Sequence, residues 1–271
     1  MEHYLWLIPL GFIVGAYGTL IGAGGGFALV PVLLLLYPHE SPEIITSISL
    51  AVVFFNALSG SWAYARMGRI DYKSGVLFAI AAIPGAILGA LSTAYVSRRL
   101  FNIILGVLMI AAAIFLFFHS NKEKGIEERK PANHFMRYIV EKNGTAHTFS
   151  YSPVIGIAIS FFVGYVSSFL GIGGGIIHVP VLAYLLNFPV HIATATSHFI
   201  LAILALTGTI VHIATGAFSH GVRRTIALSI GVLLGAQLGA VLSSRVHGNW
   251  IIRSLAIPIG LVGVRILIMA L

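Results

Sequence analysis

The sequence predicts an all-α membrane protein that crosses the bilayer many times and consists of two similar halves. Hydrophobic residues make up 58% of the chain and charged residues 9%, whereas soluble domains carry about 25% charged residues. Apolar runs of the roughly 20 residues that span a bilayer recur along the whole length. The segments GAGGG (22–26) and GIGGG (171–175) each stand in such a run, and each is followed by a proline five residues on.

Ten apolar segments are expected to be helices. They are 5–20, 26–37, 44–66, 74–95 and 100–119 in the first half, and 151–170, 176–187, 192–216, 222–244 and 250–270 in the second. We therefore expect a first transmembrane repeat at 1–119, a polar linker at 120–150 and a second repeat at 151–271. Each repeat has four to five helices and contains one glycine-broken helix. The first apolar run lacks a basic leader and a small-residue cleavage site, so it is interpreted as a retained membrane segment.

Matching residues support the duplication. Glycines and a proline of the first motif recur 149 residues later, Thr46-Ser47 aligns with Thr196-Ser197, and PGAILGA (84–90) aligns with LGAQLGA (234–240). The G-x-x-x-G pairs in these last two blocks are typical of close helix packing.

The polar linker is expected to contain a β-hairpin. Asn143-Gly144 lies between two segments rich in aromatic and β-branched residues within 135–152, which is a strong short-range hairpin signal. A flexible linker is the alternative. The many Lys and Arg residues of this loop place it in the cytoplasm, since cytoplasmic loops of membrane proteins are enriched in basic residues.

The glycine breaks leave two topologies open. If 5–20 and 26–37 form one broken span, each half crosses four times and the halves run parallel. If the chain turns back at the glycines, each half crosses five times and the halves are inverted. The two topologies place the same total number of basic residues on the inside, because Arg223/Arg224 and Arg245/Arg253 only exchange sides, so the charge rule does not decide.

Several functions are excluded by what the sequence lacks. The net charge of +8 resides in short loops between apolar runs, which excludes a nucleic-acid-binding protein, and the absence of cysteine excludes disulfides and thiolate metal sites. No P-loop occurs, and Phe27 replaces the third glycine of a dinucleotide-binding motif. We expect no cofactor, no metal and no catalytic residues. Acidic residues fall in loops, so proton coupling would need histidine, tyrosine or the substrate itself.

The glycine breaks are the strongest candidates for a site. Irregular backbone persists at membrane depth only where it is buried in protein or lines a cavity, and a helix that restarts there offers free N–H groups and a positive dipole end to an anion. Close packing of small residues is the alternative. The candidate anion-binding glycines are Gly22, Gly24, Gly25, Gly26, Gly171, Gly173, Gly174 and Gly175.

Polar residues beside the breaks complete the candidate site. Thr46, Ser47, Thr196 and Ser197 would supply hydroxyl groups, and His198 would bind the anion or carry an ion-coupling proton, because its reference pKa lies near neutrality. Hydroxyls that bond their own helix, and a histidine that only packs, are the alternatives.

These residues resemble the sulfite exporter TauE/SafE family, the TSUP permeases. The resemblance rests on GTLIGAGGGFALVPVL (18–33), SSFLGIGGGIIHVPVL (167–182), HIATATSHF (191–199) and the G-A-x-x-G-A block of each half. It implies an integral membrane permease for small sulfur-containing anions such as sulfite, thiosulfate or organosulfonates, in a bacterial or archaeal plasma membrane. Its partners would be the anion, the lipid bilayer and coupled protons or ions.

Two other functions compete with a secondary transporter. A passive anion channel would share every feature above. An intramembrane enzyme would use Ser59 or Ser197 as nucleophile with His198 or His212. Neither serine lies in a G-x-S-x-G turn, and the side chains of adjacent residues on a helix diverge, which argues against the enzyme.

Overall fold

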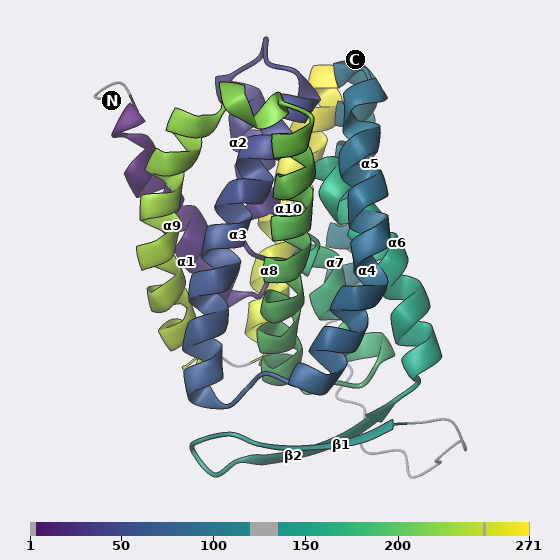
Figure 1. The fold of residues 1–271 in the computed structure, drawn as a ribbon. Helices are drawn as coiled ribbons and strands as arrows, with labels where there is room; N and C mark the ends of the chain where they lie inside the picture. The colour runs from purple at the N-terminus through teal and green to yellow at the C-terminus, as the bar shows by residue number, and fades with distance from the viewer. Residues whose placement is uncertain (1–3, 120–134, 246–247, 271) are drawn as a thin grey trace.

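The computed structural model describes residues 4–119, 135–245 and 248–270, and it is almost entirely helical (Figure 1). The first half holds α1 (Leu7–Leu20), α2 (Gly26–Leu36), α3 (Pro42–Met67), α4 (Tyr72–Ser92), the 3-10 turn η2 (Thr93–Tyr95) and α5 (Arg98–His119). The second half holds α6 (Pro153–Leu170), α7 (Gly175–Pro180), which continues as a π-helical turn η3 (Val181–Leu185), α8 (Val190–Ala214), the 3-10 turn η4 (Ala217–His220), α9 (Val222–Ser243) and α10 (Gly248–Ala270). Between the halves lie the strands β1 (Phe135–Val140) and β2 (Ala146–Tyr151).

Six of the helices, within the described residues, are long and apolar enough to cross a membrane: α3, α4, α5, α6, α8 and α9. Helices occur at all ten predicted places. The segments that follow the glycine breaks are shorter, at 26–36 and 175–185.

The chain turns back at the first break instead of continuing across the membrane. Arg224, in the first turn of α9, contacts Tyr4, which precedes α1. The same guanidinium lies 4.0 Å from the ring centroid of Tyr37, which follows α2, and 2.8 Å from a carboxylate oxygen of Glu40. The beginning of α1 and the end of α2 therefore share one end of the molecule.

The second break reverses the chain at the other end. Tyr151, just before α6, and Phe188, just after η3, have ring centroids 5.2 Å apart. Both lie at the end of the bundle covered by the hairpin, which we call the hairpin end (Figure 1). Since α1 begins at the opposite end and α6 at the hairpin end, the two halves run in opposite directions. This geometry favours the turned-back chain with inverted halves over one broken span with parallel halves. It does not show five crossings in each half, because α1 and α2 have only 14 and 11 residues and are shorter than the candidate spans.

Contacts between the halves follow a matched pattern. Helix α1 of the first half packs along α9 of the second, and α6 of the second half packs along α4 of the first in the same way. Likewise, α3 packs against α9, and α8 packs against α4. The equivalent helices α3 and α8 also pack against each other, as do α5 and α10. Glycines permit the closest approaches: a β-carbon at Gly85 would lie 2.1 Å from the Phe161 carbonyl oxygen, and one at Gly235 would lie 2.2 Å from that of Phe12. The packing role predicted for the G-x-x-x-G pairs is thereby confirmed.

The hairpin forms as predicted, with Phe135 opposite Tyr151 and Val140 opposite Ala146. Its connection spans 141–145 rather than two residues, because the Asn143 side chain accepts a hydrogen bond from the Thr145 N–H and Gly144 adopts a φ of 88°. Phe149 and Tyr151 are buried against Phe188.

Two ion pairs fasten the hairpin to the α3–α4 loop. Arg69 Nε lies 2.7 Å from a Glu141 carboxylate oxygen, and Arg137 donates hydrogen bonds from both Nε and Nη2 to the carboxylate of Asp71. Asp71 is 1% exposed and caps α4. The hairpin is thus a fixed part of this end.

Candidate functional site

The two glycine breaks meet inside the bundle. A β-carbon at Gly26 would lie 2.6 Å from the Ile172 carbonyl oxygen, and one at Gly175 would lie 2.4 Å from the Gly22 carbonyl oxygen. Gly24 and Gly173 both pack against Val53 and Leu201, near the midpoints of α3 and α8. The breaks therefore cross near the middle of α3 and α8, and all ten of their residues are buried.

Glycine is required at these positions by conformation as well as by space. Three residues of each break have positive φ angles between 69° and 82°: Gly22, Gly24 and Gly25 in the first, and Gly171, Gly173 and Gly174 in the second. Other residues adopt this left-handed region at a cost of about 1–2 kcal/mol. The repeated pattern makes the same reversal of the chain twice.

Each break ends at a helix start that lies inside the protein. Gly25 precedes α2 and Gly174 precedes the helical segment 175–185, and neither helix has a side-chain cap. The first N–H groups of a helix lack intrahelical partners and carry a partial positive charge. Two such helix starts next to crossing breaks form an arrangement suited to a small anion.

Hydroxyl groups of α3 and α8 reach the breaks in a symmetric way. Ser49 Oγ donates to the Gly171 carbonyl at 2.6 Å, and Ser197 Oγ donates to the Gly22 carbonyl at 3.4 Å. The sequence comparison between the halves missed Ser49 because it placed Ser49 opposite Phe199.

A two-residue shift explains that omission. Gly171 packs against Thr46, and Gly22 packs against Thr194. Thr46 is therefore the counterpart of Thr194, not of Thr196 as the sequence alignment has it. The 148-residue spacing of Gly60 and Gly208 was the signal that could have given the right register.

Two predicted hydroxyls lie elsewhere. Ser47 Oγ donates to the Ile44 carbonyl of its own helix at 2.8 Å. Thr196 Oγ1 accepts the N–H of Asp71 at 3.0 Å and so holds the α3–α4 loop. Thr46 also donates to its own helix, at the Glu43 carbonyl, and lies 3.4 Å from His212 Nε2.

His198 lies in a buried polar cluster beside the first break. Its Nε2 is 3.2 Å from Thr19 Oγ1, which also donates to Asn56 Oδ1 at 3.0 Å. The Tyr64 ring meets the imidazole edge-on at 5.8 Å, and the Tyr64 hydroxyl donates to the Thr19 carbonyl. Thr19, Asn56 and Tyr64 were not among the predicted site residues, since apolar sequence surrounds each of them.

Three further hydroxyls near the breaks have no hydrogen-bond partner among the described residues. They belong to Ser167, Ser168 and Thr194, all at most 1% exposed. A β-carbon at Gly174 would lie 2.8 Å from Ser167 Oγ. An unsatisfied buried polar group costs about 1–3 kcal/mol, so these hydroxyls mark a place where water or a ligand completes the structure.

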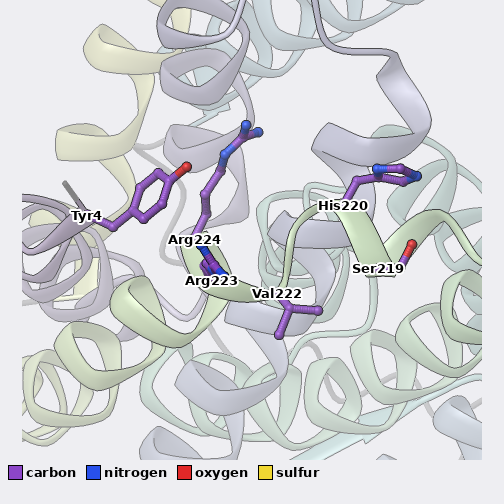
Figure 2. Close-up of a pocket in the computed structure, with 6 residues that line it drawn as sticks. All are labelled: Tyr4, Ser219, His220, Val222, Arg223 and Arg224. Carbon is purple, nitrogen blue, oxygen red and sulfur yellow. The ribbon is translucent and has the colours of Figure 1, made fainter. Parts of the chain in front are cut away.

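A separate pocket opens at the end opposite the hairpin. Its volume is about 310 Å³, and its lining residues are Tyr4, Ser219, His220, Val222, Arg223 and Arg224 (Figure 2). Arg224 is engaged with Glu40. None of the predicted site residues lines this pocket. Within the described parts of the chain, no cluster of His, Asp and Glu has the arrangement of a metal site.

Residues 7–266 match the family described as Sulfite exporter TauE/SafE. The chain belongs to this family. It is accordingly a membrane transporter and not an enzyme, and the resemblance seen in its glycine motifs is confirmed.

Relatives from bacteria and archaea agree with this assignment. The chain is 32% identical to the probable membrane transporter protein YunE of Bacillus subtilis over 270 residues, covering 97% of each chain. It is 23% identical to a probable membrane transporter protein of Methanocaldococcus jannaschii, covering 98% of this chain and 97% of the relative. No solved structure matches the chain.

Proposed function

We propose that this TauE/SafE transporter is a secondary carrier of small sulfur-containing anions such as sulfite, thiosulfate or organosulfonates. The anion would bind between two homologous repeats, residues 1–119 and 151–271, where the glycine breaks cross. The hairpin end would face the cytoplasm of a bacterial or archaeal cell.

One observation carries the proposal. Two uncapped helix starts lie beside crossing glycine breaks at the middle of α3 and α8, next to buried hydroxyls that have no partner among the described residues. Backbone N–H groups and hydroxyls are hydrogen-bond donors that match the oxygens of a sulfonate or sulfite group. The glycines would supply backbone donors, and Thr46, Ser47, Thr196 and Ser197 are the proposed hydroxyl ligands, with His198 as an ion-coupling or charge-balancing group.

The four proposed hydroxyl ligands differ in whether they contact a glycine break. Ser197 bonds to a break carbonyl and Thr46 packs on Gly171. Ser47 and Thr196 bond elsewhere, so they would have to change partners during transport. Ser49 and Thr194 join the proposal because each contacts a break.

Transport requires the two breaks to separate. The close contacts of Gly26 with Ile172 and of Gly175 with Gly22 describe a closed arrangement. Because α2 and 175–185 each return to the end where their half began, a small movement of one half against the other would open the crossing to one side at a time. Inverted repeats of transporters often provide such alternating access.

The proposal is tested with purified protein in liposomes. Labelled sulfite, thiosulfate and methanesulfonate are compared with acetate and phosphate, and empty liposomes serve as the background. We expect saturable uptake of at least one sulfur anion and faster uptake when the same unlabelled anion is inside. Saturation with counterflow distinguishes a carrier from a passive channel. Uptake of no sulfur anion by folded protein would overturn the substrate class.

A further inference from the structure

The His198 ring lies against a glycine of the facing helix, and the equivalent position of the other half has no titratable side chain. His198 is fully buried, and a β-carbon at Gly60 would lie 2.5 Å from its Cδ2 atom. In the other half the corresponding Gly208 faces Leu50 instead. Gly60 on α3 thus leaves space for the imidazole ring. The two halves differ at this position, because α8 carries the titratable His198 where α3 carries the apolar Leu50.

The Nε2 side of the ring can accommodate either protonation state. Thr19 Oγ1 lies between His198 Nε2 and the side-chain amide of Asn56. A hydroxyl both donates and accepts. With Asn56 Oδ1 facing Thr19, the hydroxyl donates to Asn56 and accepts from Nε2–H; with the amide reversed, Thr19 donates to an unprotonated Nε2. Asn56 Nδ2 has no partner among the described residues, so the reversal exchanges the bond from Thr19 to Oδ1 for one from Nδ2 to Thr19 and disturbs no other hydrogen bond of that amide.

The second ring nitrogen has no partner of its own. Nδ1 is buried and makes no hydrogen bond with any described residue, and the imidazole as a whole lies close to the backbone of Gly22. Gly22 is the residue whose carbonyl Ser197 contacts and whose backbone packs against Gly175. A proton on Nδ1 would therefore be presented to the break itself.

No carboxylate of the described residues contacts the imidazole. The polar side chains that contact it are Thr19 from α1 and Tyr64 from α3, and Asn56 from α3 lies behind Thr19. At the hairpin end, the carboxylates of Glu141 and Asp71 are already paired, with Arg69 and Arg137 respectively. A proton bound by His198 would consequently add an uncompensated positive charge, which an anion in the break would balance.

We propose that His198 is the proton carrier of a proton-coupled anion transporter. This rests on the proposed anion site at the breaks. When protonated, the ring donates from Nε2 to Thr19 and from Nδ1 to the Gly22 carbonyl or to the anion. Loss of the proton removes one donor and the charge together, so the anion loses its partner on the side where the proton leaves.

The test uses liposomes with a defined pH difference across the bilayer. Labelled thiosulfate and methanesulfonate are the probes, because neither changes its charge between about pH 5.5 and 8, where histidine titrates. Wild-type protein is expected to accumulate the transported probe toward the alkaline side, and exchange at equal pH is measured in parallel. If the probe exchanges but does not respond to the pH difference, proton coupling is wrong while anion transport stands. If neither probe moves, the proposed function has failed instead.

His198→Gln removes the charge and keeps a hydrogen-bonding side chain. We expect it to lose accumulation driven by the pH difference by at least about tenfold, and to show a slower exchange at equal pH that no longer depends on pH, because the anion has lost a titratable partner. His178→Gln is the matched control, since His178 is also buried but lies three residues beyond the other break. It should keep pH-driven accumulation. Loss of both exchange and accumulation in folded His198→Gln would assign the residue to anion binding alone and overturn the proton role.

Thr19→Val tests the positioning of the ring without removing it. The variant removes the partner of Nε2 in both protonation states, but the protonated ring loses more stabilisation because a hydrogen bond from a charged donor is the stronger one. The pH at which driven uptake is half-maximal should fall, by about one unit. A packing role for Thr19 would lower the rate at every pH without moving this midpoint, and an unmoved midpoint would contradict the network.

Discussion

At the scale of single residues, glycine is needed in the breaks for two reasons: the backbone there has positive φ angles, and neighbouring atoms leave no space for a β-carbon. Positive φ angles and β-carbon distances below 3 Å coincide at Gly25 and Gly174, which stand directly before the two inner helices. Glycines with similar φ angles also occur where nothing is close, as at Gly216. The two effects can therefore be separated by substitution.

Replacing Gly25 and Gly174 together by alanine should abolish transport. Each alanine would be strained by about 1–2 kcal/mol in the left-handed region, and its β-carbon would lie 2.7 Å from Val14 or 2.8 Å from Ser167. Gly216→Ala carries similar strain at a φ of 83° with no neighbour within 4 Å, so it should keep its transport rate. Liposome flux, with thermal unfolding as the check on folding, measures both. Transport by the double variant would contradict a site at the breaks.

At the scale of elements, the hairpin depends on charge to stay in place. Its two ion pairs are crossed, since Arg69 and Asp71 of the α3–α4 loop pair with Glu141 and Arg137 of the hairpin. A spin label at Thr145→Cys reports its mobility, because the chain has no other cysteine.

Arg137→Ala should release the hairpin. The substitution leaves the Asp71 carboxylate buried without its cation, which costs about 3 kcal/mol. We expect a more mobile label at position 145 and a lower unfolding temperature. Lys142→Ala is the control, because Lys142 is exposed and bonds to Met67 through its backbone N–H, which alanine keeps. Equal mobility in the two variants would show that the ion pair does not hold the hairpin.

Hairpin docking should resist mild acid. Burial raises the pKa of Asp71, but hydrogen bonds from Arg137 and Ser74 outweigh it and hold that pKa below its ordinary value. Burial and the bonds from Arg69 and His147 do the same for the pKa of Glu141. A lowered carboxyl pKa stabilises the folded form fully above its unfolded value of about 4 and loses this effect as pH falls through the folded value. The label should stay immobile from about pH 8 to 5 and loosen only below about pH 4; loosening above pH 5 would contradict this.

At the scale of the whole molecule, the inverted course of the halves fixes which loops share a side. The turn η4, which contains Ser219, lies at the same end as the loop between α2 and α3, which contains His39; the end of α9, which Ser244 follows, lies at the hairpin end, where Thr145 connects β1 and β2 (Figure 1). In a chain with unreversed breaks and parallel halves, Ser219 and Ser244 would exchange sides.

Single-cysteine variants at these four positions test the topology. A membrane-impermeant maleimide applied to intact cells should label Ser219→Cys together with His39→Cys. Ser244→Cys and Thr145→Cys should react only after permeabilisation, if the basic hairpin end is cytoplasmic. Labelling of Ser219→Cys with Thr145→Cys would be incompatible with the turned-back chain.

Most of the fold could be predicted from sequence, because hydropathy identifies membrane helices and Asn-Gly identifies a hairpin locally. The paired glycine motifs also located the two breaks. By contrast, Ser49, Thr194, Thr19 and Asn56 were missed as neighbours of the breaks. Single hydroxyls and amides in apolar helices have no pattern of their own, and a two-residue error in matching the halves moved the assignment along α8.

The sequence by itself determined that this chain is a helical membrane protein with two glycine-broken segments, since both follow from composition and local backbone preference. The tertiary structure alone decided that each break reverses the chain, that the breaks cross, and that His198 faces Thr19 and Gly22. These depend on contacts between residues up to 179 positions apart. The number of charged residues in the loops and the periodicity of the helices do not specify whether the chain continues or turns back after a glycine.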